Sequence, residues 1–133
     1  MGERSRAGGE IGVSNTSCHA RRCDCSSCDL RSEWTVDVSV YVDPSVQRQG
    51  HGRKLYSALF EILRAQGYYT ACAGIALPND ASVGLHEAMG FELVGVYGNV
   101  GYKLDRWIDV GWWALPLREY DASPKPPRKF SEL

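Results

Sequence analysis

The sequence predicts an α/β fold in which helices flank a mixed central sheet. The chain has 133 residues, a usual length for one domain, and 44% of them are hydrophobic and 23% charged. This balance is typical of a globular protein and excludes a disordered or fibrous one. Between residues 34 and 120 the hydrophobic spacing changes in order from that of strands to that of helices and back.

The first predicted strand is TVDVSVYV, residues 35–42. Valine stands at every second position, so one face of this strand is apolar. The opposite face therefore holds Asp37, Ser39 and Tyr41.

Leucine and isoleucine then recur at helical spacing over residues 52–66, and Gly67 is expected to end this helix. The next strand, residues 68–77, is small and apolar, as in strands that are covered on both faces or closely approached by a ligand. A turn leads into a short helix that is expected to end at Gly90. Two more strands complete the mixed sheet, at residues 91–97 and 106–115.

The two ends of the chain differ in composition from the middle. Residues 1–33 are rich in Gly, Ser, Arg and Cys and hold too few large apolar side chains to offset the entropy of ordering, which predicts a poorly ordered leader. Residues 121–133 contain three prolines and predict an extended tail. The folded unit is expected at residues 34–120.

The charge balance limits the classes of partner. With 15 basic and 16 acidic residues the net charge is −1, so no overall field attracts nucleic acid or an anionic membrane. No apolar run reaches the roughly 18 residues of a membrane helix, and the first residues do not resemble a secretory signal. We expect a cytoplasmic protein that binds neither nucleic acid nor membranes.

The segment QRQGHGR, residues 47–53, lies between a predicted strand and a predicted helix. Its two glycines let several backbone N–H groups turn toward one point, and the helix start adds about half a positive charge. The segment favours a pyrophosphate cradle, with an ordinary glycine loop as the alternative. It is neither a Walker loop, since no Gly-Lys-Ser/Thr follows, nor a dinucleotide fingerprint, since the glycine spacing differs.

The order of VSVYV, Q-x-x-G-x-G, a helix, a small-residue strand and LPNDASVGLHEAMGF resembles the coenzyme A half of GNAT-superfamily N-acetyltransferases. More narrowly, TVDVSVYV, IALPNDASVGLHEAMGF and GYKLDRWIDVGWW resemble the phosphinothricin acetyltransferase branch, whose members acetylate small amino acids or their analogues. The likeness covers residues 34–117. It implies the GNAT-like acyl-CoA N-acyltransferase fold, acetyl-CoA as cosubstrate, a small-molecule amine as acceptor, and a homodimer.

The resemblance also implies where coenzyme A binds. Backbone groups at residues 40–42 would bond the pantetheine arm as an added strand would, and the glycine loop would hold the pyrophosphate. Asn79 would bind the cofactor near the start of the second helix, with a simple helix cap as the alternative. The implied contacts are Val40, Tyr41, Val42, Arg48, Gln49, Gly50, His51, Gly52, Arg53 and Asn79.

The implied chemistry is direct transfer, in which a neutral amine attacks the thioester. Asp37 stands where relatives carry their proposed base, normally a glutamate, so this shorter side chain would act through a water molecule. A solvent-facing strand carboxylate is the alternative. The N–H of Tyr41 or Val42 is the candidate oxyanion donor. His86 stands at the acid tyrosine position and would protonate sulfur, or else it is a structural residue.

Residues 102–109 resemble the family's segment near the acceptor site. Relatives commonly read Trp-His-Asp where this chain reads Trp-Ile-Asp at residues 107–109, a departure that weakens the assignment of acceptor contacts there. The tryptophans that follow, Trp112 and Trp113, are expected in the core or at a dimer interface.

Residues 1–33 lack any match to the strands and helices that form much of the acceptor pocket in such enzymes, which suggests a truncated gene model or a frameshifted start. Two functions remain: an active N-acetyltransferase completed by a dimer partner or a longer chain, and a non-catalytic remnant that only binds coenzyme A.

Four leader cysteines (residues 18, 23, 25 and 28) are too closely spaced for a typical zinc site, so no metal is predicted. A zinc-dependent interaction module is the third hypothesis for the function.

Overall fold

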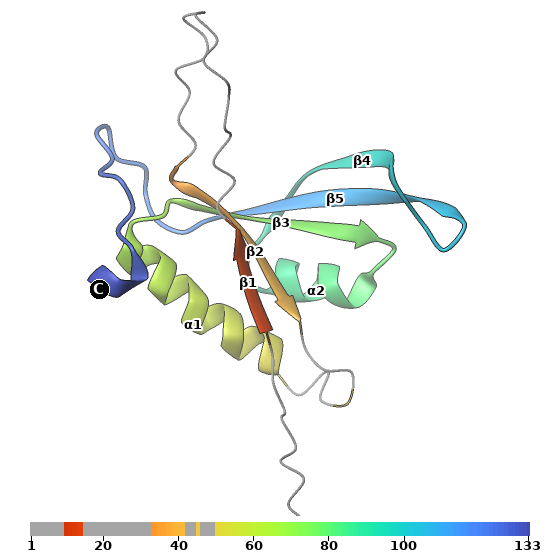
Figure 1. The fold of residues 1–133 in the computed structure, drawn as a ribbon, viewed down its shortest axis with the longest axis horizontal. Coiled ribbons are helices and arrows are strands. Elements are labelled where there is room, and N and C mark those ends of the chain that lie inside the picture. Colours follow the sequence, from red (N-terminus) through yellow and green to blue (C-terminus); the bar gives the residue numbers. More distant parts are fainter. Residues whose placement is uncertain (1–9, 15–32, 42–44, 46–49) are drawn as a thin grey trace, which may run out of the picture.

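The computed structural model describes residues 10–14, 33–41, 45 and 50–133 (Figure 1). They form a five-stranded mixed sheet with the strand order β1-β2-β3-β5-β4. Its strands and helices are β1 Glu10–Ser14, β2 Thr35–Tyr41, α1 His51–Gln66, β3 Thr70–Leu77, α2 Asp80–Ala88, β4 Glu92–Lys103, β5 Arg106–Pro116 and the short 3-10 turn η2 Phe130–Glu132. The predicted α/β class with a mixed sheet flanked by helices is confirmed. None of the helices in the described ranges has both the length and the apolar character needed to cross a membrane.

Strand β1 lies inside the segment expected to be a poorly ordered leader. It pairs antiparallel with β2, from Glu10 opposite Tyr41 to Ser14 opposite Asp37. At these five residues the structure differs from the expectation, because the backbone of β2 supplies hydrogen-bond partners that local composition cannot reveal. The boundary of the folded unit at residue 34 stays a prediction.

Strands β2 and β3 are parallel but pair over only three residues, ending at Asp37 opposite Cys72. Beyond that pair β2 continues to Tyr41 alongside β1, while β3 continues to Leu77 alongside β5. Figure 1 shows the two strands diverging from this point. The sheet thus has an opening between its two parallel strands.

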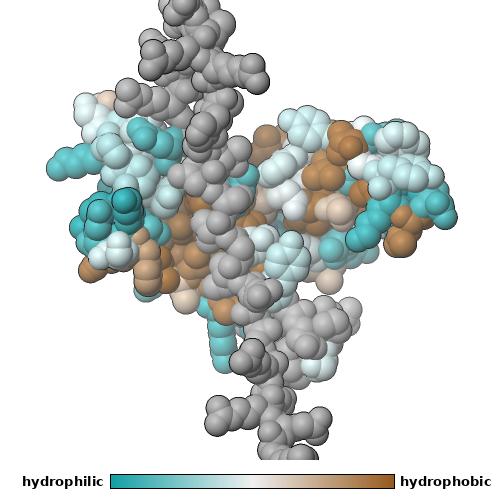
Figure 2. All heavy atoms as spheres, viewed as in Figure 1, coloured by the Kyte–Doolittle hydropathy of each residue, from teal (hydrophilic) through white to brown (hydrophobic). Residues whose placement is uncertain are grey.

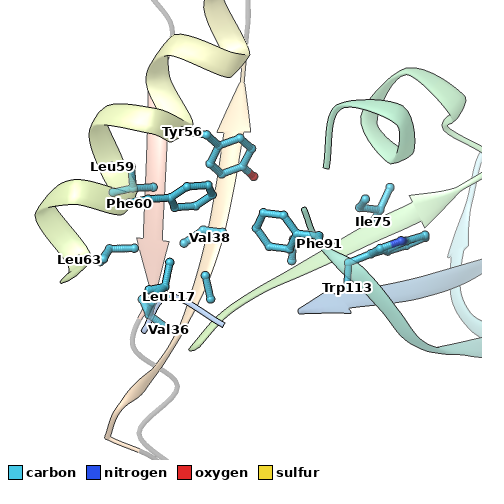
Figure 3. Packing of buried hydrophobic residues seen from close by; sticks show 12 residues of the cluster. Val36, Val38, Tyr56, Leu59, Phe60, Leu63, Ile75, Phe91, Trp113 and Leu117 are labelled. Carbon is cyan, nitrogen blue, oxygen red and sulfur yellow. The ribbon is translucent and has the colours of Figure 1, made fainter. Parts of the chain in front are cut away.

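The core fills the face of the sheet that α1 and α2 cover (Figure 3). Val36 and Val38 of β2 are buried, as the period of two predicts, and the aliphatic and aromatic stripe of α1 packs on them. The other members of the cluster come from β3, from β5 and the residue that follows it, and from the residue before β4: Ala71, Ala73, Ile75, Phe91, Trp113 and Leu117.

The turn residues act as the sequence predicts. Gly67 and Gly90 follow the ends of α1 and α2 with φ of 100° and 98°, a left-handed conformation that only glycine adopts readily. Asn79 caps the start of α2, where its side-chain oxygen accepts a hydrogen bond from the Ser82 N–H at 3.1 Å.

The C-terminal segment, predicted to be an extended tail, is held against the end of α1 and the start of β2. The Trp34 indole donates to the Lys125 carbonyl at 2.8 Å. The backbone N–H of Arg128 donates to the Gln66 carbonyl at 2.7 Å, and its guanidinium donates to the Ala65 carbonyl at 3.0 Å. Composition predicts the extended backbone of this segment but not the partners that hold it.

Candidate active site

The opening between β2 and β3 is the first element of the candidate site. Within the described residues, the β3-facing edge of β2 has no strand partner after Asp37. Val40 and Tyr41 follow on this part of β2; the Val40 side chain is half-buried against the core and the Tyr41 side chain is 67% exposed. Val42, the third residue predicted here, lies outside the described residues. An extended ligand that offers hydrogen-bonding groups can pair with such an edge.

The start of α1 is the second element. Gly50 precedes the helix with φ of 79°, and a side chain added there would meet no atom within 4 Å. The first turn of α1 contains no acidic residue, and its N-cap residue, Gly50, has no side chain that could accept a hydrogen bond from it. The backbone N–H groups at a helix start and the helix dipole together suit an anion.

The remaining predicted loop residues divide into two groups. His51 and Gly52 are half-buried in the first turn of α1, and Arg53 is exposed beside them. Arg48 and Gln49 lie outside the described residues. Of the predicted pyrophosphate cradle, the structure therefore describes Gly50 and the residues in the first turn of α1.

Asp37 stands at the point where the parallel strands part. Its side chain is half-buried on the face opposite the core valines, and its partner in β3 is Cys72. Burial raises the pKa of the Cys72 thiol, and the negative charge of Asp37 raises it further. The carboxylate and the thiol therefore lie close together on the face that the helices do not cover.

His86 lies on the other face, inside the core, with a side chain only 5% exposed. Its Nδ1 is 2.7 Å from the Ser82 carbonyl, which makes Nδ1 the donor, and its Nε2 then accepts from the Tyr56 hydroxyl at 2.6 Å. Burial lowers the pKa of His86, although the hydrogen bond to Ser82 raises it in part. Asp37 and His86, both predicted to be catalytic, are thus on opposite faces of the sheet.

Tyr56 is the partner that sequence reasoning missed. Its side chain is fully buried, and burial raises the pKa of the hydroxyl well above its ordinary value, so this group stays a donor. The ring packs on Phe60 and Phe91 with centroids 5.2 and 5.9 Å apart. The available signal was a tyrosine at a core position of the helical stripe, which needs a polar partner when buried.

The predicted acceptor segment at residues 102–109 lies far from Asp37. Tyr102 and Trp107 face each other near the turn between β4 and β5, with ring centroids 5.3 Å apart. Cys72, the partner of Asp37, pairs with Ala114, which is about 20 Å farther along β5 than Trp107. Within the described residues, the structure does not bring this segment and Asp37 together.

Asp109 has a structural role at the bulge of this hairpin. Its carboxylate accepts a hydrogen bond from the Asn99 N–H at 2.8 Å, where β4 shifts register against β5. Asn99 has φ of 53°, and this contact holds the backbone in that conformation.

Comparison with known proteins identifies the family. The model of the acetyltransferase (GNAT) domain matches residues 23–112. The chain belongs to the GNAT acetyltransferase family. It is 43% identical over 101 residues to a phosphinothricin N-acetyltransferase of Streptomyces viridochromogenes, a match that covers 76% of this chain and 55% of the relative.

Two further relatives point to the same branch. An L-methionine sulfoximine/L-methionine sulfone acetyltransferase of Salmonella typhimurium is 42% identical over 89 residues, covering 67% of this GNAT chain and 52% of the relative. The crystal structure of a phosphinothricin acetyltransferase from Sinorhizobium meliloti in complex with acetyl-CoA superposes with a TM-score of 0.65 at 35% identity, over 71% of this chain and 50% of that one. The predicted family and branch are confirmed. The chain spans about half the length of the curated relatives that it matches.

Proposed function

We propose that this protein transfers the acetyl group of acetyl-CoA to the amino group of a small amino acid or analogue, of the phosphinothricin or methionine sulfone type. The observation that carries the proposal is the opening between β2 and β3 with Asp37 at its apex, in a chain of the GNAT family. The names of the relatives, and the acetyl-CoA bound to one of them, support the choice of substrates.

The described residues fit acetyl-CoA in two places. The open edge of β2 near Val40 and Tyr41 suits the amides of the pantetheine arm, and we assign Val42 to the same contact on the resemblance alone. The start of α1 suits the pyrophosphate, with backbone N–H groups from Gly50, His51 and Gly52 and a cation from Arg53. We assign Arg48, Gln49 and Asn79 to the same site on the resemblance alone.

Asp37 is the proposed general base, acting through a water molecule. The amine nitrogen forms a bond to the acetyl carbon, the carbon–sulfur bond breaks, and its electron pair leaves with the sulfur. Two protons leave the nitrogen in turn: Asp37 takes the one from the ammonium before attack, and the sulfur receives the second. Backbone N–H groups of Tyr41 or Val42 would stabilise the carbonyl oxygen as it gains charge.

The proton-donor role of His86 stays a prediction. Both of its ring nitrogens are engaged, and burial favours the neutral ring. His86 would have to exchange the Tyr56 hydroxyl for another partner before it could deliver a proton, so the contacts favour a structural role.

We also propose a homodimer that uses the β4–β5 hairpin. This hairpin exposes apolar side chains on an edge strand, and Figure 2 shows them over this part of the molecule. An exposed apolar edge is a usual site of association. The most exposed are Leu93, Val94, Val96, Tyr97, Val100, Tyr102, Leu104 and Trp107. The cytoplasmic location and the absence of nucleic-acid and membrane partners stay predictions.

A remnant that only binds coenzyme A is the second candidate function. One observation favours it: among the described residues, no helix covers the face of the sheet that holds Asp37. One assay distinguishes the two functions. The purified chain is incubated with acetyl-CoA and a panel of amino acids that includes phosphinothricin and methionine sulfone. Amino-acid-dependent release of free thiol supports the enzyme, and thermal stabilisation by coenzyme A without release supports the remnant.

A further inference from the structure

The two adjacent tryptophans of β5 point to opposite faces of the sheet. Trp113 is 4% exposed, lies in the core, and donates its indole N–H to Glu87 of α2 at 3.3 Å. Trp112 is half-buried and lies on the open face, because successive side chains of a strand alternate. The core explains Trp113 but gives no reason for a large aromatic side chain at residue 112.

The ring of Trp112 extends across the neighbouring strand. Gly74 of β3 is the register partner of Trp112, and a Cβ atom at Gly74 would lie 3.0 to 3.2 Å from three carbons of the six-membered ring. The indole therefore lies flat over a position that has no side chain. Glycine at this position makes the contact possible.

This contact places the indole beside the opening between the parallel strands. Gly74 is two residues beyond Cys72, about 7 Å along β3 in the direction in which β2 and β3 diverge. Asp37 is the partner of Cys72 and lies on the same face. An apolar surface and a carboxylate thus flank the opening on the face that the helices leave uncovered.

The two faces of the sheet differ in access. The helix face is filled by the core, so an amine that reaches a thioester in the opening must approach from the open face. Its amino group would then lie near Asp37, while its remaining atoms extend over Gly74. A flat indole offers those atoms apolar contact and offers a cationic group a cation–π contact.

We propose that Trp112 is a specificity-determining residue that packs against the aliphatic part of the acceptor amino acid. The proposal rests on the proposed function, because it assumes an acceptor on the open face. Gly74 has a positioning role, since it leaves the space that the indole occupies. The site would take small amino acids whose side chains carry methylene groups next to a polar end.

The test compares Trp112→Leu with Trp34→Leu in the full chain. Trp34 is also half-buried but lies before β2, at the opposite end from the opening, and is outside the proposed site. Trp112→Leu is expected to raise the KM for methionine sulfone about tenfold, with the KM for acetyl-CoA unchanged within about twofold. Trp34→Leu is expected to leave both constants unchanged, and Trp112→Phe to recover most of the affinity.

Gly74→Ala supplies a second test that leaves Trp112 in place. The added methyl group would displace the indole by a few tenths of an ångström, so the KM for the acceptor should rise while the KM for acetyl-CoA does not. In the Trp112→Leu background the same change should have no further effect. An equal effect in both backgrounds would overturn the positioning role of Gly74.

A binding measurement separates failure of this proposal from failure of the proposed function. Tryptophan emission of the chain with coenzyme A is followed as methionine sulfone is added, and the change is expected in the wild type and in Trp34→Leu but not in Trp112→Leu. Thiol release with an unchanged acceptor KM in Trp112→Leu overturns the role of Trp112 and leaves the enzyme standing. A Trp112-dependent emission change without thiol release would contradict the proposed acetyltransferase function and would support an acceptor site at Trp112. If neither the emission change nor thiol release is seen, both proposals are contradicted.

Discussion

The two faces of one sheet serve different purposes in this molecule. On the helix face Val36, Ala71 and Trp113 are almost completely buried beneath α1 and α2. On the open face their strand neighbours Asp37, Cys72 and Trp112 are half-buried and include a carboxylate and a thiol. Each residue pair is adjacent in sequence, so the alternation of strand side chains alone separates the core from the candidate site.

The difference shows why the same strands can be stable and reactive at once. The helix face contributes apolar burial, which is worth about 25 cal/mol per Å² removed from water. Less apolar area is buried on the open face, where Asp37 and the opening between β2 and β3 are accessible. Substitutions on the two faces should therefore affect different measurements.

The largest expected effect on stability comes from the adjacent tryptophans. Trp113→Leu removes a buried ring and its hydrogen bond to Glu87, and should lower the free energy of unfolding by about 3 kcal/mol. Trp112→Leu, on the open face, should lower it by about 1 kcal/mol or less. Urea unfolding of both variants and the wild type gives the comparison, and equal losses would contradict the division between the faces.

The largest expected effect on activity comes from Asp37. Asp37→Asn keeps the shape of the side chain but removes the base, so thiol release with a saturating amino acid should fall about 100-fold. That fall corresponds to about 2.7 kcal/mol in the activation free energy. Unfolding should change little, because Asp37 is on the open face. Ser39→Ala, two residues away on the same face, is the matched control, and a similar fall in that variant would argue against a specific role for Asp37.

A smaller loss of stability is expected at Tyr56, on the helix face. Tyr56→Phe keeps the ring packing but leaves His86 Nε2 without its donor inside the core, which should cost about 2 kcal/mol of unfolding free energy. Ser57→Ala is the control, since it removes an exposed hydroxyl from the next position of α1. A Tyr56→Phe variant as stable as this control would show that the hydrogen bond contributes little.

These faces were largely predictable from the sequence, because alternation and glycine caps are local properties. TVDVSVYV indicated both the buried valines and the side of Asp37, and Gly67 and Gly90 indicated where the helices end. Partners distant in sequence were not predictable. The pairing of β1 with β2 joins residues 23 to 31 apart in the sequence, and the contact of Trp112 with Gly74 joins residues 38 apart.

The candidate site was predicted in part for the same reason. A family resemblance singled out both Asp37 and His86 from their positions in two motifs, but motif position does not reveal which face of the sheet a side chain reaches. His86 lies in the core, where the hydroxyl of Tyr56, 30 residues earlier in the sequence, donates a hydrogen bond to its ring. Such a pairing depends on how α1 packs against α2, which no local pattern encodes.

The smallest expected effect is a dependence of stability on pH, which arises from His86 on the helix face. Because burial lowers the pKa of His86 below its unfolded value of about 6.5, the unfolded chain binds a proton more readily than the folded chain as the pH falls below that value. The neutral histidine therefore contributes stability that is fully present above pH 6.5 and is lost as the pH falls through the folded pKa. The free energy of unfolding should therefore fall as the pH is lowered below about 6.5, measured by urea unfolding at each pH, and the fall should level off below the folded pKa. His86→Gln should abolish this part of the slope and His51→Gln should retain it. A slope unchanged in His86→Gln would mean that the proton is taken up elsewhere, and the buried histidine would then not link the core to pH.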